Sequence, residues 1–239
     1  MSLTYATFVS SLANMLVIPP TNTDYLAFIP NVIDDAEQRI YRELDLLTTI
    51  VRDQTGTLTA NSRNFTLPQS GGRFVVTESM NVFTPVGLTT YRNQLIPVSR
   101  EWVDAVYPDE GAAVCCGPSV PRYYAMITDQ TIIVGPPPDQ NYTMEVVGII
   151  RPTPLSATNT STYLTAYLPD LFLAESLIFG YGYLKDFGAA TDDPRGSTTW
   201  SAHYQDLWQS ANVEENRKKY ASQAWTPKQP APLATPPRN

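Results

Sequence analysis

The chain has 239 residues, 43% of them hydrophobic and 16% charged, which is a globular balance and enough for one large domain or two small ones. Its formal net charge of −7 argues against a basic surface that holds DNA through the phosphates. Its only cysteines, Cys115 and Cys116, are adjacent, which argues against a secreted disulfide scaffold.

Two helices are expected at the start of the chain. Residues 3–17 place apolar side chains near one side of a helix, and two prolines stop it. A second helix is expected over residues 29–47, with Pro30 in its first turn, where a missing N–H is harmless, and with its end near residues 49–54. One apolar stripe on this helix needs a partner, and it consists of Ile33, Ala36, Ile40, Leu44 and Leu47.

The second helix also carries charges. Asp35 and Arg39 are four residues apart in the favourable order and are expected to pair, which stabilises a helix by about 0.2–0.5 kcal/mol. The other acidic residues considered on this helix are expected on solvated faces, and they are Glu37, Glu43 and Asp45.

The middle of the chain, residues 55–155, has the composition of short strands. Thr, aromatic and β-branched residues occur in runs that Asn, Gly and Pro interrupt. One helical insert is expected at residues 99–107, with Ser99 as its N-cap. Several short strands between turn signals are typical of a small β-sandwich or barrel. The loop "GPPPDQN", residues 135–141, is either a tip that meets another protein or a hairpin loop.

The helical pattern returns after a polar linker at residues 156–162. Residues 168–188 are apolar nearly all round, which predicts a helix that is buried on most sides, with a neighbouring subunit as a candidate cover for one of them. The "GYG" at residues 180–182 lies in this helix, where glycine allows close packing. A further helix follows the turn at residues 192–194, and "EENRKK" at residues 214–219 is expected to be its solvated face. The apolar stripe of that helix consists of Trp200, Tyr204, Leu207 and Ala211.

The last stretch, residues 226–239, contains five prolines and predicts an extended, polyproline-like arm. The expected fold class is therefore α+β, a helical bundle with a β-sandwich or barrel-like domain inserted between the second and third long helices, plus this arm. In that architecture the helix over residues 29–47 packs against helices that follow residue 165. The expected domains are residues 1–54 and 156–225 for the two halves of the helical core, 55–155 for the β domain and 226–239 for the arm.

Residues that carry chemistry are few. His203 is the only histidine and falls in an aromatic helix, so we interpret it as structural. One histidine and two adjacent cysteines do not supply the clustered ligands of a metal site. Acidic pairs are better explained as helix starts or turns than as glycosidase carboxylates. The sequence therefore predicts no catalytic residue, no metal, no cofactor, no signal peptide and no membrane span.

Five stretches follow one another along the chain in a recognisable order: "AEQRIYRELDLL", "GTLTANSRNFTLP", "PVSREWVDAVYP", "PRYYAMITDQTIIVGPPPDQNYTMEVVGIIRPTPLS" and "YLPDLFLAESLIFGYGYLKDFGAATDDP". Together the chain resembles head-to-tail adaptor (connector) proteins of tailed double-stranded DNA bacteriophages, over nearly its whole length to about residue 225. The resemblance implies a helical core with a β domain between the second and third long helices. It also implies a ring of about twelve copies beneath the portal.

The resemblance also implies partners and a location. The partners are the portal protein, tail or nozzle proteins, other copies in the ring, and double-stranded DNA that passes through the channel without specific binding. The location is the virion neck, after synthesis in the host cytoplasm and with no membrane. The candidates for portal contact on the arm are Trp225, Pro227, Lys228, Pro230, Leu233, Pro236 and Arg238. The candidates for bundle and inter-subunit packing are Ile33, Ile40, Leu44, Leu47, Leu171, Ile178, Tyr181, Trp200 and Leu207.

Two alternative functions stay open at this point. The first is an adaptor with peptidoglycan hydrolase activity, for which Glu37, Glu43 and Asp45 are the carboxylates on offer. The second is a virion module that binds glycans through the Tyr and Trp residues of the β domain, residues 55–155.

Overall fold

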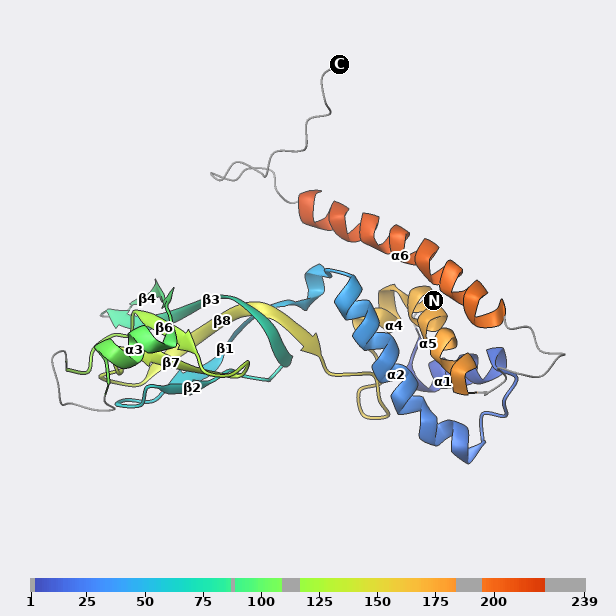
Figure 1. Cartoon of the computed structure of the whole chain (residues 1–239), viewed down its shortest axis with the longest axis horizontal. Helices are drawn as coiled ribbons and strands as arrows, with labels where there is room; N and C mark the ends of the chain where they lie inside the picture. Colours follow the sequence, from blue (N-terminus) through green and yellow to red (C-terminus); the bar gives the residue numbers. More distant parts are fainter. Residues whose placement is uncertain (1–2, 87–88, 109–116, 184–194, 222–239) are drawn as a thin grey trace, which may run out of the picture. The chain divides into compact units, whose positions relative to one another are not determined.

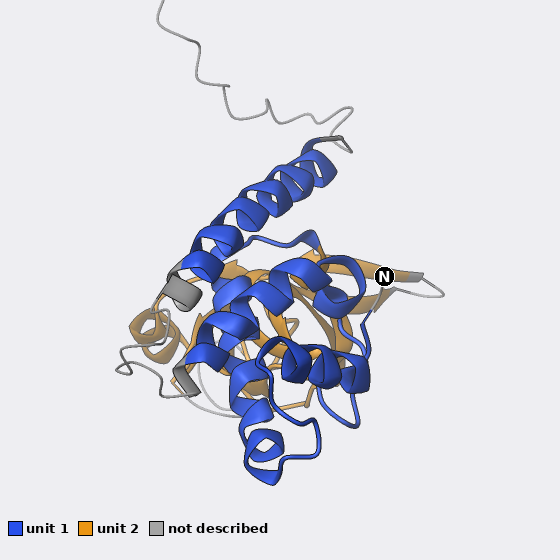
Figure 2. Cartoon of the chain, turned by 90° about the vertical axis from the view of Figure 1, so that its right-hand side faces the viewer, with its two compact units in different colours: residues 1–47, 154–239 blue, residues 48–153 orange. Residues whose placement is uncertain are grey.

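The computed structural model describes residues 3–86, 89–108, 117–183 and 195–221 (Figure 1). The chain divides into two compact units, Met1–Leu47 with Pro154–Asn239 and Thr48–Thr153 (Figure 2). The first unit is helical, and the second contains all the strands that the described residues form. The α+β class expected from the sequence is therefore confirmed. The proline-rich arm, the turn at residues 192–194 and the two cysteines lie outside the described residues.

The described part of the helical unit is organised around one central helix. Its α-helices are α1 (Tyr5–Met15), α2 (Thr23–Glu43), α4 (Tyr163–Tyr167), α5 (Pro169–Tyr183) and α6 (Arg195–Ala221), and a short 3-10 helix, Leu47–Thr49, follows α2. α5 contacts each of the other four α-helices. The expectations that this apolar helix is buried on most sides and that α2 packs against helices after residue 165 are both confirmed.

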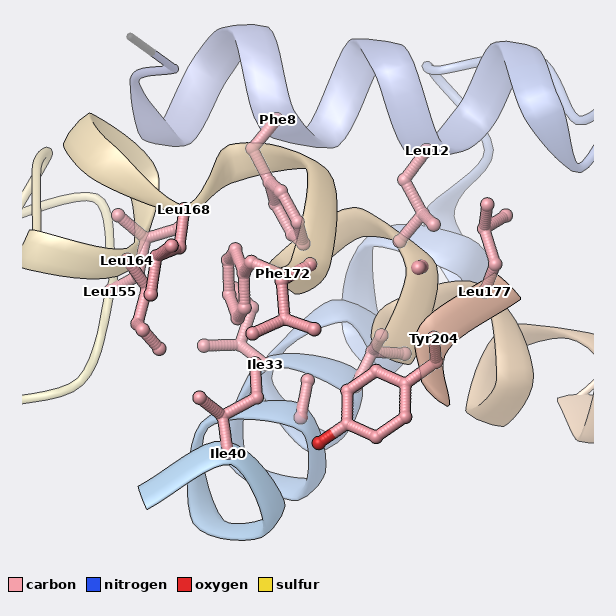
Figure 3. Packing of buried hydrophobic residues seen from close by; sticks show 14 of the residues in the cluster. Phe8, Leu12, Ile33, Ile40, Leu155, Leu164, Leu168, Phe172, Leu177 and Tyr204 are labelled. Atoms are coloured by element: carbon pink, nitrogen blue, oxygen red, sulfur yellow. The ribbon is translucent and has the colours of Figure 1, made fainter. Parts of the chain in front are cut away.

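The core of the helical unit brings together side chains that are far apart in the sequence (Figure 3). The rings of Phe8 on α1 and Phe172 on α5 stack with their centroids 4.7 Å apart. Ile33 and Ile40 of α2 and Tyr204 of α6 belong to the same cluster, and each of these five residues is at most 1% exposed. A core of this kind forms only when both halves of the unit meet, because neither half covers its own apolar stripe.

The boundaries expected for the second helix were wrong at its start. α2 begins at Thr23, and the side chain of Asn22 caps it by accepting hydrogen bonds from the N–H groups of Asp24 and Tyr25 at 2.9 and 3.2 Å. Pro30 therefore lies inside the helix. The buried stripe already starts at Tyr25, whose hydroxyl donates to the carbonyl of Val9 at 2.8 Å, so packing and capping outweigh the hydrogen bond that proline removes.

The boundaries were also wrong at the end of this helix. α2 ends at Glu43, because Leu44 takes an extended conformation with φ −109° and ψ 128°. Leu44 and Leu46 are both buried, and only an extended chain points residues two apart to the same side. Leu47 consequently lies outside the helix and is 42% exposed, so its assignment to the helical stripe was wrong. Strand β1 is already under way at Ile50, where the sequence suggested helix.

Gly180 allows the close helix packing that the sequence suggested. A Cβ atom at this position would lie 3.0 Å from Cδ1 of Leu16, the residue that ends α1. That distance is shorter than an ordinary carbon–carbon contact of about 3.5–4.0 Å. The absence of a side chain at Gly180 therefore lets α1 approach α5.

The second unit consists of two four-stranded sheets. The first sheet has the order β1-β8-β3-β4 with antiparallel neighbours throughout, and the second has the order β2-β7-β6-β5, in which only β5 and β6 are parallel. The strands are β1 (Ile50–Leu58), β2 (Asn64–Thr66), β3 (Gly72–Val86), β4 (Thr89–Gln94), β5 (Ile96–Pro97), β6 (Tyr123–Met126), β7 (Thr131–Gly135) and β8 (Tyr142–Pro152).

The two sheets share one apolar core. Val82 and Met144 of the first sheet belong to the same buried cluster as Ile132 and Val134 of the second. This is the arrangement of a β-sandwich. The helix α3 (Arg100–Val106) packs on the second sheet through a separate cluster around Val103.

Two local expectations for this unit can be compared with the structure. Ser99 caps α3 by accepting a hydrogen bond from the N–H of Trp102 at 3.2 Å, so the helical insert and its cap are confirmed. The interpretation of residues 135–141 as a hairpin loop is wrong, because the loop joins β7 to β8, which belong to different sheets. A hairpin loop joins neighbouring antiparallel strands of one sheet.

Candidate interaction surfaces

The residues proposed for packing differ in how much surface they leave for a partner. The most buried ones are at most 3% exposed within the helical unit, and they are Ile33, Ile40, Leu44 and Leu171. A second set is half-buried at the edge of the same cluster, and it consists of Ile178, Tyr181, Trp200 and Leu207. Only this second set and Leu47 retain surface that another molecule can cover. The seven arm candidates lie outside the described residues.

A charged cluster joins three helices of the helical unit. Nη1 of Arg39 on α2 donates to both carboxylate oxygens of Glu175 on α5, at 2.8 and 3.0 Å, and its Nε donates to Glu43 at 2.9 Å. The hydroxyl of Tyr204 on α6 donates to the other oxygen of Glu43 at 2.7 Å, and the Arg39 guanidinium lies 4.6 Å from the centroid of the Tyr204 ring. Arg39 therefore pairs with Glu43 and Glu175. The sequence-based prediction that Arg39 pairs with Asp35 was wrong.

Glu175 is the member of this cluster that most needs its partner. Its side chain is 2% exposed, and burial raises the pKa of its carboxyl group while the Arg39 guanidinium opposes that shift. Burial and the neighbouring Glu43 carboxylate likewise raise the pKa of the Tyr204 hydroxyl. A buried carboxylate without its cation is strongly destabilising, so Arg39 is required for Glu175 to be tolerated in the core.

A second charged cluster lies near the other end of α6. Glu215 is 3% exposed and accepts hydrogen bonds from the Leu47 N–H at 3.1 Å, the Tyr163 hydroxyl at 3.0 Å and the Lys218 ammonium at 2.7 Å. Burial alone would raise the pKa of Glu215, but these donors outweigh burial and hold the pKa below its usual range. The expectation that residues 214–219 form a solvated face was therefore wrong for Glu215, because the face that contacts α4 includes it.

Glu37 on α2 was also expected on a solvated face, and the structure buries it. The residue is 4% exposed, and its carboxylate accepts a hydrogen bond from the Leu155 N–H at 3.1 Å. Burial is the largest cause that raises the pKa of Glu37, to about 7. A raised pKa is one property of a general acid, but a group this buried is closed to a cell-wall polymer, so the hydrolase alternative gains no support here.

The sandwich unit contains a buried carboxylate of its own. Glu145 on β8 is fully buried, and four side chains from β1, β3 and β4 contact it. Asn81 donates to it at 2.9 Å, Gln54 at 2.6 Å and Arg92 at 3.0 Å, and Arg52 also pairs with it. One acidic side chain thus links β1, β3 and β4 to β8 on the face of the first sheet that points away from the core.

Sequence reasoning missed the burial of all four glutamates, Glu37, Glu145, Glu175 and Glu215, although the sequence carries a signal for two of them. Glu175 is the only charged residue in "LFLAESLIFG", and Glu145 is the only one in "YTMEVVGII". A single carboxylate in an apolar run indicates a buried charge with a partner elsewhere. Glu215 gives no such signal, because its neighbours in the sequence are charged.

The described residues offer little for catalysis or metal binding. No group of three or more His, Cys, Asp or Glu side chains among them is placed to hold a metal ion. His203 is exposed on α6 with its ring 5.7 Å from that of Trp200. Glu43 and Asp45 are both engaged by basic residues, Glu43 by Arg39 and Asp45 by Lys219.

Large apolar side chains are exposed on the face of α6 opposite these clusters. Val213 is 49% exposed and Tyr220 is 68% exposed, and their separation of seven positions corresponds to about two helical turns. Exposed charged and polar residues lie between them, and neither Val213 nor Tyr220 belongs to the buried cluster of the unit. This outward face of α6, defined by Val213 and Tyr220, is a candidate surface for contact with another molecule.

The Arg39 cluster gives a test of stability. We expect Arg39→Met to lower the free energy of unfolding by about 3 kcal/mol, because Glu175 is left buried without its cation. The matched change Arg42→Met, at an exposed arginine of the same helix, is expected to alter it by less than about 0.5 kcal/mol. Urea denaturation followed by circular dichroism measures both. The double variant Arg39→Met with Glu175→Gln should recover part of the loss, and an unchanged midpoint for Arg39→Met would show that the pair is not stabilising.

Glu37 gives a test of pH dependence. The folded pKa of Glu37 lies above its unfolded value, so its stabilising contribution is complete below pH 4.5 and is lost as the pH rises through about 7. We expect the wild type to lose about 3 kcal/mol relative to Glu37→Gln between pH 4 and pH 8. Urea denaturation of both proteins across this range measures the difference, with Asp206→Asn as an exposed control. A constant difference between wild type and Glu37→Gln would contradict the prediction.

Comparison with known proteins gives one clear finding. Residues 3–231 match the family model described as SU10 adaptor protein, which spans both compact units. A search of curated proteins gives no match. Among the described residues, no helix is both long enough and apolar enough to cross a membrane.

Proposed function

Because the chain belongs to the SU10 adaptor protein family, a family of phage head-to-tail adaptors, we propose that it forms a ring in the virion neck that joins the portal to the tail. The observation that carries the proposal is the extent of the family match, from residue 3 to residue 231. An adaptor links parts of the virion, and the partners proposed here are the portal protein and the tail or nozzle proteins. The family match confirms the resemblance to phage head-to-tail adaptors that the sequence indicated.

The ring would consist of about twelve copies in a closed cyclic arrangement. In a heterologous ring each copy uses two different surfaces, so a contact surface must be exposed in the single chain. The most buried candidates cannot serve, since they have no exposed area left. The outward face of α6 and the half-buried residues Trp200 and Leu207 supply exposed apolar area instead.

The portal contact is proposed for the C-terminal arm, residues 226–239. Its five prolines restrict the unbound chain, so the arm loses less conformational entropy when it binds than a flexible segment would. Leu233 and Trp225 would supply apolar contacts, and Lys228 and Arg238 would pair with carboxylates of the portal.

The proposed channel transmits DNA without holding it. The net charge of −7 supports this part of the proposal, because an acidic wall repels phosphates and keeps DNA from adhering. The role is structural, without a catalytic step, and the protein would be made in the host cytoplasm before it joins the particle.

The portal contact can be tested by light scattering after size-exclusion chromatography. We expect the full chain mixed with isolated portal rings to add about twelve times the monomer mass of 26.5 kDa. Deletion of residues 226–239 should abolish the addition, because the arm supplies the anchor. A deletion variant that still adds fully to the portal would contradict the role of the arm, and a full chain that never adds would contradict the adaptor proposal.

The ring contact can be tested on the same assembly. We expect Tyr220→Glu with Val213→Glu to reduce the number of copies on the portal, because charges on the outward face of α6 oppose an apolar contact. The variant should unfold at the same temperature as wild type, since both side chains are exposed. Gln209→Glu, an exposed polar position of α6, is the matched control. Complete rings from the double variant would remove this face from the proposed contact.

A further inference from the structure

Strand β4 has a free edge. It is the terminal strand of the first sheet and pairs only with β3. The N–H of Leu95 bonds to the carbonyl of Met80, and antiparallel pairs alternate between bonded and non-bonded positions, so the backbone groups of Arg92 and Gln94 point away from β3. No other strand or loop among the described residues takes up these backbone groups.

A cleft of about 730 Å³ lies along this edge, entirely within the sandwich unit. Arg92 and Gln94 line it from β4, Ile96 from β5, and Arg122 and Gln140 from the adjoining loops. The open edges of the two sheets therefore flank one depression. A volume in this range is typical of clefts that bind a ligand.

The sandwich interior becomes polar where it reaches the cleft. On β3 the inward-facing position after Val82 is Thr84, and on β8 the inward-facing position before Met144 is Tyr142. Thr84 and Tyr142 both line the cleft. The Tyr142 hydroxyl donates to Asp139 at 2.6 Å. The Thr84 hydroxyl accepts a hydrogen bond from the Asn93 side chain at 2.6 Å. These polar groups are therefore paired within the unit, and the groups left for a ligand at the cleft are the outward backbone groups of β4.

The cleft is lined by two arginines, Arg92 and Arg122, and by one carboxylate, Asp139. Arg92 is already paired with the buried Glu145. Arg122 is exposed and forms none of the ion pairs among the described residues, while Asp139 in the same cleft accepts the Tyr142 hydroxyl. In a chain with a net charge of −7, the exposed guanidinium of Arg122 beside an open strand edge is a local site for a carboxylate.

We propose that this cleft binds an extended, carboxylate-bearing peptide segment of another virion protein, which adds to β4 as a fifth strand of the first sheet. The backbone of the segment pairs with Arg92 and Gln94, and an acidic side chain reaches Arg122. Strand addition of this kind uses main-chain hydrogen bonds for affinity and side-chain pockets for specificity. The partner class rests on the proposed adaptor role, whereas the free edge and the cleft are independent of ring formation.

Backbone recognition favours a peptide over a glycan as the occupant. The open groups at the edge are backbone N–H and carbonyl groups of β4, which pair with the backbone of another extended chain. The six residues of β4 span about 20 Å, the length of an extended peptide of similar size. Ile96, Val120 and Pro121 add apolar contacts on one side of the cleft. A second copy of the chain could also present an acidic segment to Arg122, and the net charge of −7 opposes that only weakly. Self-association is therefore one outcome of the test.

The test uses fluorescein-labelled twelve-residue peptides that tile the structural proteins encoded by the same phage, with the full chain as receptor. Fluorescence anisotropy should identify binders that contain Asp or Glu. Gln94→Pro should weaken their binding at least about tenfold, because proline removes the edge N–H and is tolerated on an edge strand. Gln94→Ala should retain affinity within about twofold. Arg122→Ala should weaken acidic peptides, and the matched Arg100→Ala on α3 should not.

Several outcomes would overturn the proposal. They are the absence of any binding peptide, peptides whose binding survives both Gln94→Pro and Arg122→Ala, competition by oligosaccharides and not by peptides, or self-association of the chain that Gln94→Pro abolishes. Arg122→Ala is a surface change and keeps the test decisive if the proline variant does not fold. The portal addition measured by light scattering should be unchanged in Gln94→Pro, so a failure of this proposal and a failure of ring formation give different results.

Discussion

The ion pair between Arg39 and Glu175 is the constraint on which the helical unit depends. Glu175 lies on the central helix, where its carboxylate is removed from water, and among the described residues Arg39, from the other half of the unit, is the cation that compensates for that burial. The same guanidinium binds Glu43, which in turn accepts the hydroxyl of Tyr204 on α6. Because three helices meet at one cation, the pairing of the two chain segments is specified by charge as well as by apolar packing.

This arrangement explains how a long helix with a narrow apolar stripe is held in place. Tyr204 and Ala211 are the fully buried apolar residues among the described part of α6, and Glu215 provides a polar contact near its end. One face of α6 packs on α5, and the opposite face stays exposed, including Val213 and Tyr220. The ring contact is proposed for this face because a contact between copies would need exposed apolar area of this kind.

The sandwich unit also contains a buried carboxylate that joins several elements. Glu145 is buried on the outer side of the first sheet and draws donors from three neighbouring strands, so it fixes those strands in one register. One of those donors, Arg92, also borders the open edge of β4. The buried network therefore holds the free edge in a defined position, which is the condition for recognising an extended partner with its backbone groups.

The sequence by itself determined the kinds of elements, their order and the family, because periodicity, caps and turn residues act locally. Ser99 capping α3 is such a local feature. Tertiary structure decided the limits of α2, where burial of Tyr25 and Leu44 outweighed the expected roles of Pro30 and Leu47. It also decided the ion pairs. Asp35 was the natural partner of Arg39 along one helix, but the low-polarity core around Glu175 makes that carboxylate need the cation far more than an exposed one does.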